Sequence, residues 1–110
     1  MTLTISDRQS DGFHVIELDG DIDLNSAREL RAHFVERITD PATRVVVDLT
    51  GVDFMDSSGL GALVGGWQIV RGHGSFRIAG ANATVRRVLE ITGMDDVFPL
   101  FPAVADATAD

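Results

Sequence analysis

Two adjacent hydroxyl groups, on Ser57 and Ser58, are the side chains of this chain best placed for a chemical role. They lie between a β-branched apolar run at residues 44–49 and an apolar repeat of three- and four-residue spacing over residues 60–70. The run predicts a buried strand, and the repeat predicts an amphipathic helix. At such a junction the backbone N–H groups and the helix dipole favour negative charge. An unmodified serine there can cap the helix, and a phosphorylated serine would gain electrostatic support.

A catalytic serine is the weaker interpretation of the same residues. The G-x-S-x-G pattern of a hydrolase nucleophile is absent around Ser57, and a nucleophilic serine also needs a base. The three histidines, His14, His33 and His73, fall in a strand, a helix and a loop without a pattern that pairs them with a serine. We expect them to be hydrogen-bonded or solvent-facing, and we expect no enzymatic activity.

Two other patterns fall short of ligand-binding motifs. Residues 19–23 place aspartates at alternate positions, as a calcium loop does, but the sixth and twelfth positions hold Leu24 and Leu30 where glycine and glutamate are required. The spacing G-x-G-x-x-x-G from residue 59 differs from the dinucleotide fingerprint. We therefore expect no metal ion and no cofactor. The acidic segment is either a solvated turn that leads into a capped helix or a recognition surface beside the serines.

Composition narrows the class of protein further. The chain has 110 residues, a length that is ordinary for one domain, and 45% of them are hydrophobic. A net charge of −8 argues against direct nucleic-acid binding. The absence of cysteine excludes disulfides and fits a reducing compartment. Apolar runs are too short to cross a membrane and residues 1–20 do not resemble a signal peptide, so we expect a cytoplasmic protein without membrane contact.

The segments that must position the serines alternate between strands and helices. Apolar alternation and β-branched runs predict strands at residues 2–8, 13–18, 44–49, 75–79 and 97–101. Three- and four-residue spacing predicts helices over residues 24–38, 60–70 and 85–92, and residues 103–109 can add one or two helical turns. The order is thus β-β-α-β-α-β-α-β-(α).

This order predicts an α/β fold, a mixed sheet with helices packed on it, in a single domain over residues 1–110. The polar link at residues 9–12 favours an antiparallel hairpin, whereas connections that contain a helix favour crossovers between parallel strands. Pro99 cannot donate a hydrogen bond to a neighbouring strand, so the last strand is expected at an edge of the sheet.

The first helix carries its own signals. Its apolar stripe is expected to consist of Leu24, Ala27, Leu30, Phe34 and Ile38. Asp23, Asn25 and Ser26 are candidate caps, and residues 26–29 match the capping-box pattern.

Three segments together resemble one known family, the STAS-domain anti-sigma factor antagonists. Residues 46–63 contain M-D-S-S-G-L-G, which closely resembles the signature of that family. Residues 18–23, L-D-G-D-I-D, resemble its L-x-G-E-L-D start of the first helix, and residues 85–94 resemble its V-x-x-x-L-x-x-x-G-[LM] third helix. The resemblance spans about residues 3–102 and leaves out the tail at 103–110.

The resemblance implies a sheet of four or five strands flanked by helices and a cycle of partner switching. An unphosphorylated antagonist binds an anti-sigma factor that is itself a serine kinase, and a sigma factor is released. The kinase then phosphorylates the first serine of the pair, which is Ser57 here, and a serine phosphatase resets the cycle. Ser58 would keep the capping role. The partner-binding residues implied are Asp21, Asp23, Asp56, Ser57, Ser58, Gly59 and Leu60.

Departures from the family pattern and other settings of the domain leave alternatives open. Asp21 stands where glutamate is more usual. The glycine pair at residues 65–66 costs roughly 1 kcal/mol per residue inside a helix, so either the helix is loosened or a partner backbone approaches closely. A STAS scaffold or interaction module in a stressosome-like or transporter-associated complex is the alternative function, and the residues do not exclude a bound nucleotide.

Overall fold

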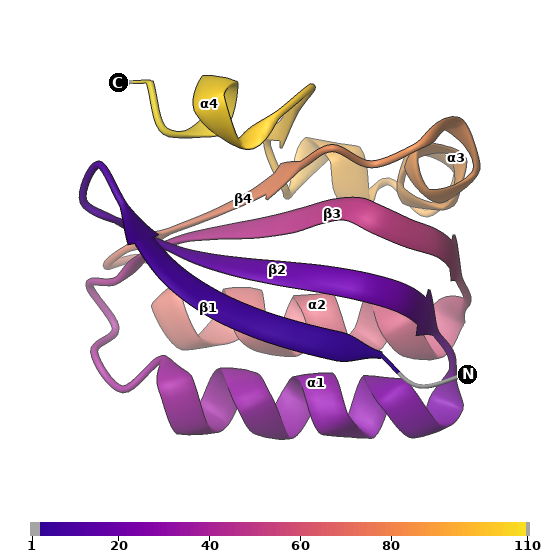
Figure 1. Ribbon diagram of the computed structural model, residues 1–110, viewed down its shortest axis with the longest axis horizontal. Coiled ribbons are helices and arrows are strands. Elements are labelled where there is room, and N and C mark those ends of the chain that lie inside the picture. Colours follow the sequence, from indigo (N-terminus) through magenta and orange to yellow (C-terminus); the bar gives the residue numbers. More distant parts are fainter. Residues whose placement is uncertain (1–2, 110) are drawn as a thin grey trace.

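The computed structural model describes residues 3–109 and contains one five-stranded sheet of order β1-β2-β3-β4-β5 (Figure 1). The strands are β1 (Thr4–Ser10), β2 (Phe13–Ile22), β3 (Arg44–Met55), β4 (Ser75–Ala79) and β5 (Leu100–Phe101). β1 and β2 form an antiparallel hairpin, and the other neighbours are parallel. The predicted mixed sheet, its element order and the edge position of the last strand are confirmed.

Helices cover both faces of the sheet. α1 (Leu24–Arg37) and α2 (Ser57–Val70) lie side by side on one face, and α3 (Ala83–Ile91) and α4 (Val104–Ala107) lie on the other (Figure 1). A short 3₁₀ helix at Met94–Asp96 links α3 to β5. Residues 97–99, predicted as the start of the last strand, lie between this helix and β5, and only Leu100–Phe101 pair with β4.

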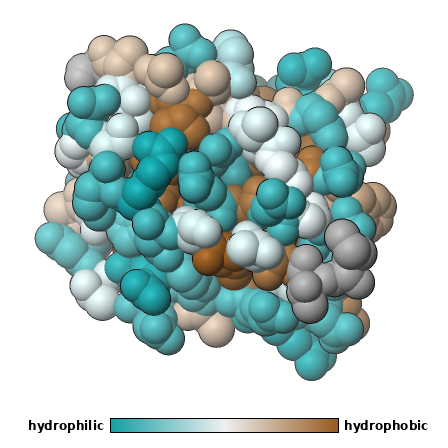
Figure 2. Space-filling view, in the orientation of Figure 1, coloured by the Kyte–Doolittle hydropathy of each residue, from teal (hydrophilic) through white to brown (hydrophobic). Residues whose placement is uncertain are grey.

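Buried side chains form two clusters, one larger and one smaller. β2 alternates between them, because Val15 belongs to the smaller cluster and Ile16 to the larger, and β3 does the same at Val46 and Val47. Burial on both faces is typical of strands in parallel pairings. Figure 2 shows that polar residues cover most of one outer face, with smaller apolar areas between them.

β2 and β3 are longer than predicted. The expected strands ended at residues 18 and 49, but β2 continues to Ile22 and β3 to Met55. The two strands pair along this extension with register shifts, one of them next to Gly20, whose φ is 123°. Such irregularities let a strand absorb residues that by themselves favour a turn. The predicted first strand, residues 2–8, is shifted to residues 4–10, and its first residue lies outside the described range.

The cap of α1 also differs from the predicted capping box at residues 26–29. Asp23 is the N-cap, and its Oδ1 accepts hydrogen bonds from the backbone N–H groups of Asn25 and Ser26, both at 3.1 Å. The Ser26 hydroxyl oxygen accepts the Asp23 backbone N–H at 2.8 Å, which completes a box one turn earlier than expected. Leu24, predicted on the buried stripe, is 57% exposed at the first position of the helix.

Candidate functional site

The candidate site lies where β2 leads into α1 and β3 leads into α2. The two strand ends are neighbours, since Ile22 pairs with Met55 and the Asp56 backbone N–H donates to the Ile22 carbonyl at 3.2 Å. Asp21 pairs with Phe54 one position earlier. Segments more than 30 residues apart in sequence therefore meet where the carboxyl ends of β2 and β3 lie side by side. The predicted acidic residues come together there with the serine pair.

Asp56 is the residue that caps α2. Its backbone is extended, and its Oδ1 accepts hydrogen bonds from the N–H groups of Ser58 at 2.8 Å and Gly59 at 3.2 Å. The prediction that Ser58 is the cap is therefore wrong, because both serines already lie inside the helix. Two of the backbone donors at this helix start are occupied by a carboxylate, so they are not free for a phosphate.

The residues of the serine pair differ in exposure. Ser57 is exposed, whereas Ser58 and Leu60 are half-buried and Gly59 is buried. A Cβ atom on Gly59 would lie 2.6 Å from Met55 Cγ and 2.7 Å from Ile22 Cγ2. Gly59 thus allows α2 to approach the ends of both strands, and the hydroxyl of Ser57 is left accessible to a partner.

Two exposed apolar side chains at this edge were not among the predicted site residues. Phe54 is 46% exposed, and Leu24 is 57% exposed. Simple alternation along β3 does not find Phe54, because Val52 is buried and both Asp53 and Phe54 are exposed, at a register shift between β2 and β3. We name the set Asp21, Asp23, Leu24, Phe54, Asp56, Ser57, Ser58 and Leu60 the junction surface.

The hydrogen-bonded carboxylate of Asp23 is stabilised in its charged form. Hydrogen bonds from the backbone N–H and the side chain of Ser26, together with the Asn25 N–H, lower the pKa of Asp23. The Asp23 carboxylate therefore remains a negative charge at the junction surface under all conditions near neutral pH.

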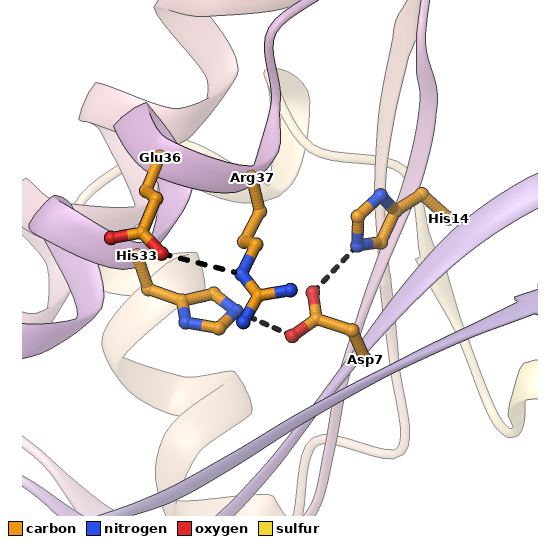
Figure 3. Close-up of polar contacts among 5 residues, drawn as sticks. All are labelled: Asp7, His14, His33, Glu36 and Arg37. Atoms are coloured by element: carbon orange, nitrogen blue, oxygen red, sulfur yellow. Dashed lines mark hydrogen bonds and ion pairs between the residues drawn. The ribbon is translucent and has the colours of Figure 1, made fainter.

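The histidines are engaged away from the serines. Asp7 on β1 lies between His14 on β2 and His33 on α1, with Oδ1 2.6 Å from His14 Nε2 and Oδ2 2.7 Å from His33 Nε2 (Figure 3). Burial by itself raises the pKa of Asp7, but the hydrogen bond from His14 and the charge of His33 outweigh it and lower the pKa. The expectation of hydrogen-bonded or solvent-facing histidines is confirmed, since His73 is exposed.

Within residues 3–109, no three His, Asp or Glu side chains are grouped as metal ligands are. The aspartates from 19 to 23 lie along β2 and at the cap of α1, not in a loop that wraps around a cation. Among the same residues, no helix combines the length and the apolar character that crossing a bilayer requires.

Comparison with known proteins identifies similar chains over nearly the whole length. A family model described as STAS domain matches residues 4–107. The chain is 31% identical over 107 residues to the anti-sigma-F factor antagonist RsfB of Mycobacterium tuberculosis, covering 97% of this chain and 86% of that protein. It is 30% identical to the anti-sigma-B factor antagonist of Staphylococcus aureus, covering 88% and 91%.

Solved structures are similar as well. A crystal structure of an anti-sigma factor antagonist from Mycobacterium paratuberculosis superposes with a TM-score of 0.86 at 29% identity, covering 97% of this chain and 92% of that one. The similarity in sequence and in structure thus covers the sheet, the helices and the junction surface together.

Proposed function

The chain belongs to the STAS domain family, and we propose that it is an anti-sigma factor antagonist switched by phosphorylation of Ser57. In its unphosphorylated form it binds an anti-sigma factor that is a serine kinase, and the sigma factor is released. The kinase phosphorylates Ser57, the complex dissociates, and a serine phosphatase restores the binding form. The observation that carries this proposal is the exposed Ser57 at the first helical position of α2, inside the segment that resembles the family signature.

The junction surface has the chemistry of a protein-binding site. The exposed apolar side chains of Phe54 and Leu24 supply area that a partner can bury. The carboxylates of Asp21, Asp23 and Asp56 are half-buried, and they favour a partner with positive charge facing them. Gly59 contributes indirectly, because its missing side chain sets the position of α2.

Phosphorylation can break such a complex without a change of fold. A phosphoserine carries about −1.5 to −2 charges, and at residue 57 it would follow directly after the Asp56 carboxylate. The N–H groups of Ser58 and Gly59 already bind Asp56 and cannot compensate this charge. A hundredfold loss of affinity needs only about 2.8 kcal/mol. Removing the phosphate dianion from water beside the Asp56 carboxylate, inside a docked interface, costs enough free energy to produce that loss.

In this proposal the chain is a substrate and a binding module, and the kinase supplies ATP and the base. It acts in the cytoplasm, where RNA polymerase and its sigma factors work. In the kinase's reaction the Ser57 hydroxyl attacks the γ-phosphate of ATP and ADP leaves, so the chain needs no catalytic base of its own.

The test combines mass spectrometry with binding measurements. The chain is incubated with its cognate anti-sigma kinase and ATP, and the modified residue is mapped in wild type, Ser57→Ala and Ser58→Ala. We expect phosphate on Ser57 in wild type and Ser58→Ala and none in Ser57→Ala. Calorimetry should show that Ser57→Ala still binds the kinase, whereas the phosphorylated chain binds at least tenfold more weakly. Phosphate on another residue, or equal affinities, would refute the site.

A further inference from the structure

A small pocket between α1 and α2 adjoins the serine pair. It has a volume of about 210 Å³ and is lined by Leu24, Ala27, Arg28, Arg31 and Ser58. The polar residues among them are two arginines and one serine, which carry two guanidinium groups and one hydroxyl. All three groups are hydrogen-bond donors, and two of them carry a permanent positive charge.

The side chain of Arg31 runs along α2 toward the serines. Its Cγ and Nε lie 3.9 and 3.8 Å from the place where a Cβ atom of residue 65 would be, and its Nη2 lies 3.2 Å from the corresponding place at residue 61. Gly65 and Gly61 thus leave a path along the helix surface. Ser58 is the next residue on this stripe, one turn before Gly61, so the guanidinium points to the end of α2 that carries the serine pair.

Arg28 and Arg31 form no hydrogen bond or ion pair with any other residue in the described part of the chain. A guanidinium group presents a planar set of donors that matches the oxygens of a phosphate, often in pairs. The pocket offers two such groups side by side on successive turns of α1.

The N-terminus of α2 is a second source of positive potential beside the serine pair, and the Asp56 carboxylate already occupies it. The start of α2 would ordinarily attract an anion, but Asp56 accepts the N–H groups of Ser58 and Gly59. A phosphate near the serine pair must therefore be compensated by side chains. Arg28 and Arg31 are the cations that line the pocket with Ser58.

We propose that Arg28, Arg31 and Ser58 form a phosphate-binding pocket. The phosphate has two sources, a phosphoserine at residue 57 that folds back onto α1, or a free phosphate group that enters from solution. The first source rests on the proposed function, because it requires modification of Ser57. In that case the pocket holds the phosphoserine on the chain's own surface and favours the dissociated state over the complex.

The experiment has one arm for each source. In the first arm, inorganic phosphate is titrated into the unmodified chain, and the side-chain Nε–H signals of both arginines and the amide of Ser58 are followed by NMR. In the second arm, phosphoserine is placed at residue 57 during translation, and its phosphorus signal is titrated with pH. Because no kinase is used, failure of this arm is distinct from failure of the proposed phosphorylation cycle.

We expect the second pKa of the phosphoserine to lie lower in the folded chain than in the same chain unfolded in urea. Arg28→Gln with Arg31→Gln should abolish that difference. The matched control is Arg86→Gln with Arg87→Gln on α3, which removes the same charge from exposed positions. This control should retain the pKa difference between the folded and the unfolded chain. Both double variants should keep the melting temperature of wild type within a few degrees, because their side chains are exposed.

The arms identify the source. A shifted phosphoserine pKa that depends on Arg28 and Arg31 supports the pocket with the chain's own phosphate. Saturable shifts with inorganic phosphate that disappear in the same double variant support it with free phosphate. If neither arm responds, or if the control variant responds equally, the pocket does not bind phosphate and the proposal is overturned.

Discussion

Alanine at Gly66 is expected to destabilise the protein, whereas alanine at the adjacent Gly65 is expected to stabilise it. Both glycines lie inside α2, so both substitutions remove the same backbone freedom from the unfolded chain. The sequence left two explanations for this glycine pair, a loosened helix or a close approach by a partner's backbone. The structure gives a third at Gly66, the close approach of two core aromatic rings from the chain itself.

The opposite signs follow from what a new methyl group would meet. At residue 66 it would lie 2.7 Å from Phe34 Cδ2 and 2.9 Å from Phe76 Cε2, both in the core. These rings form an edge-to-face pair with centroids 5.8 Å apart, and the methyl group would force them to move. At residue 65 the nearest atoms belong to Arg31 and lie at 3.8 and 3.9 Å, which is ordinary contact.

The magnitudes can be worked from these distances. Replacing glycine by alanine in a helix gains about 1 kcal/mol. Overpacking of a filled core costs about 1–3 kcal/mol, and a disturbed aromatic pair adds about 0.5–1.5 kcal/mol. Gly65→Ala should therefore stabilise by about 0.5–1 kcal/mol, and Gly66→Ala should destabilise by about 0.5–3.5 kcal/mol.

Urea unfolding followed by circular dichroism measures both variants against wild type. The midpoints should move in opposite directions with an unchanged slope, and thermal midpoints should differ by roughly 4 °C or more for each kcal/mol. If Gly66→Ala proves as stable as Gly65→Ala, the close approach of Phe34 and Phe76 to α2 is wrong. A changed slope for Gly66→Ala would instead indicate an altered unfolded or native state.

Three further predictions concern side-chain hydrogen bonds, two at helix N-caps and one that joins β1 to β2 and α1. Asp56→Ala should lose about 0.5–2 kcal/mol of stability with the cap of α2, and Asp56→Asn, which retains an acceptor, should recover most of it in urea unfolding. Asp7→Asn should lose roughly 1–3 kcal/mol at neutral pH, because it disturbs the bonds to His14 and His33. Since the pKa of Asp7 is lowered in the folded chain, this contribution to stability is complete above the unfolded pKa of about 4 and is lost as the pH falls through the folded pKa. A stability difference between wild type and Asp7→Asn that persists in acid would contradict this reasoning. Asn82→Ala should lose about 1–2 kcal/mol, because Asn82 caps α3 and also donates to the Val52 carbonyl of β3, as thermal unfolding would show.

Local patterns in the sequence were sufficient for the type and order of the elements. The period of apolar residues distinguishes strands from helices, and turn residues mark where the chain reverses. At the first hairpin, the expected turn is realised by Asp11 and Gly12, whose φ angles are 52° and 84°. Pro99 predicted an edge position for the last strand, and β5 does lie at the edge, with Pro99 immediately before it. The strand–helix junction that carries Ser57 was predicted in the same way.

Tertiary structure decided what depends on partners far apart in sequence. β2 extends to Ile22 only because β3 supplies hydrogen-bond partners as far as Met55, and residues rich in aspartate and glycine do not reveal this by themselves. The N-cap of α2 is Asp56 and not the predicted Ser58, because the extended end of β3 determines where the helix begins. Arg31 meets the serine end of α2 only through the packing of α1 on α2. Periodicity is a local property and can be read from one segment, whereas these contacts exist only once two segments have been brought together.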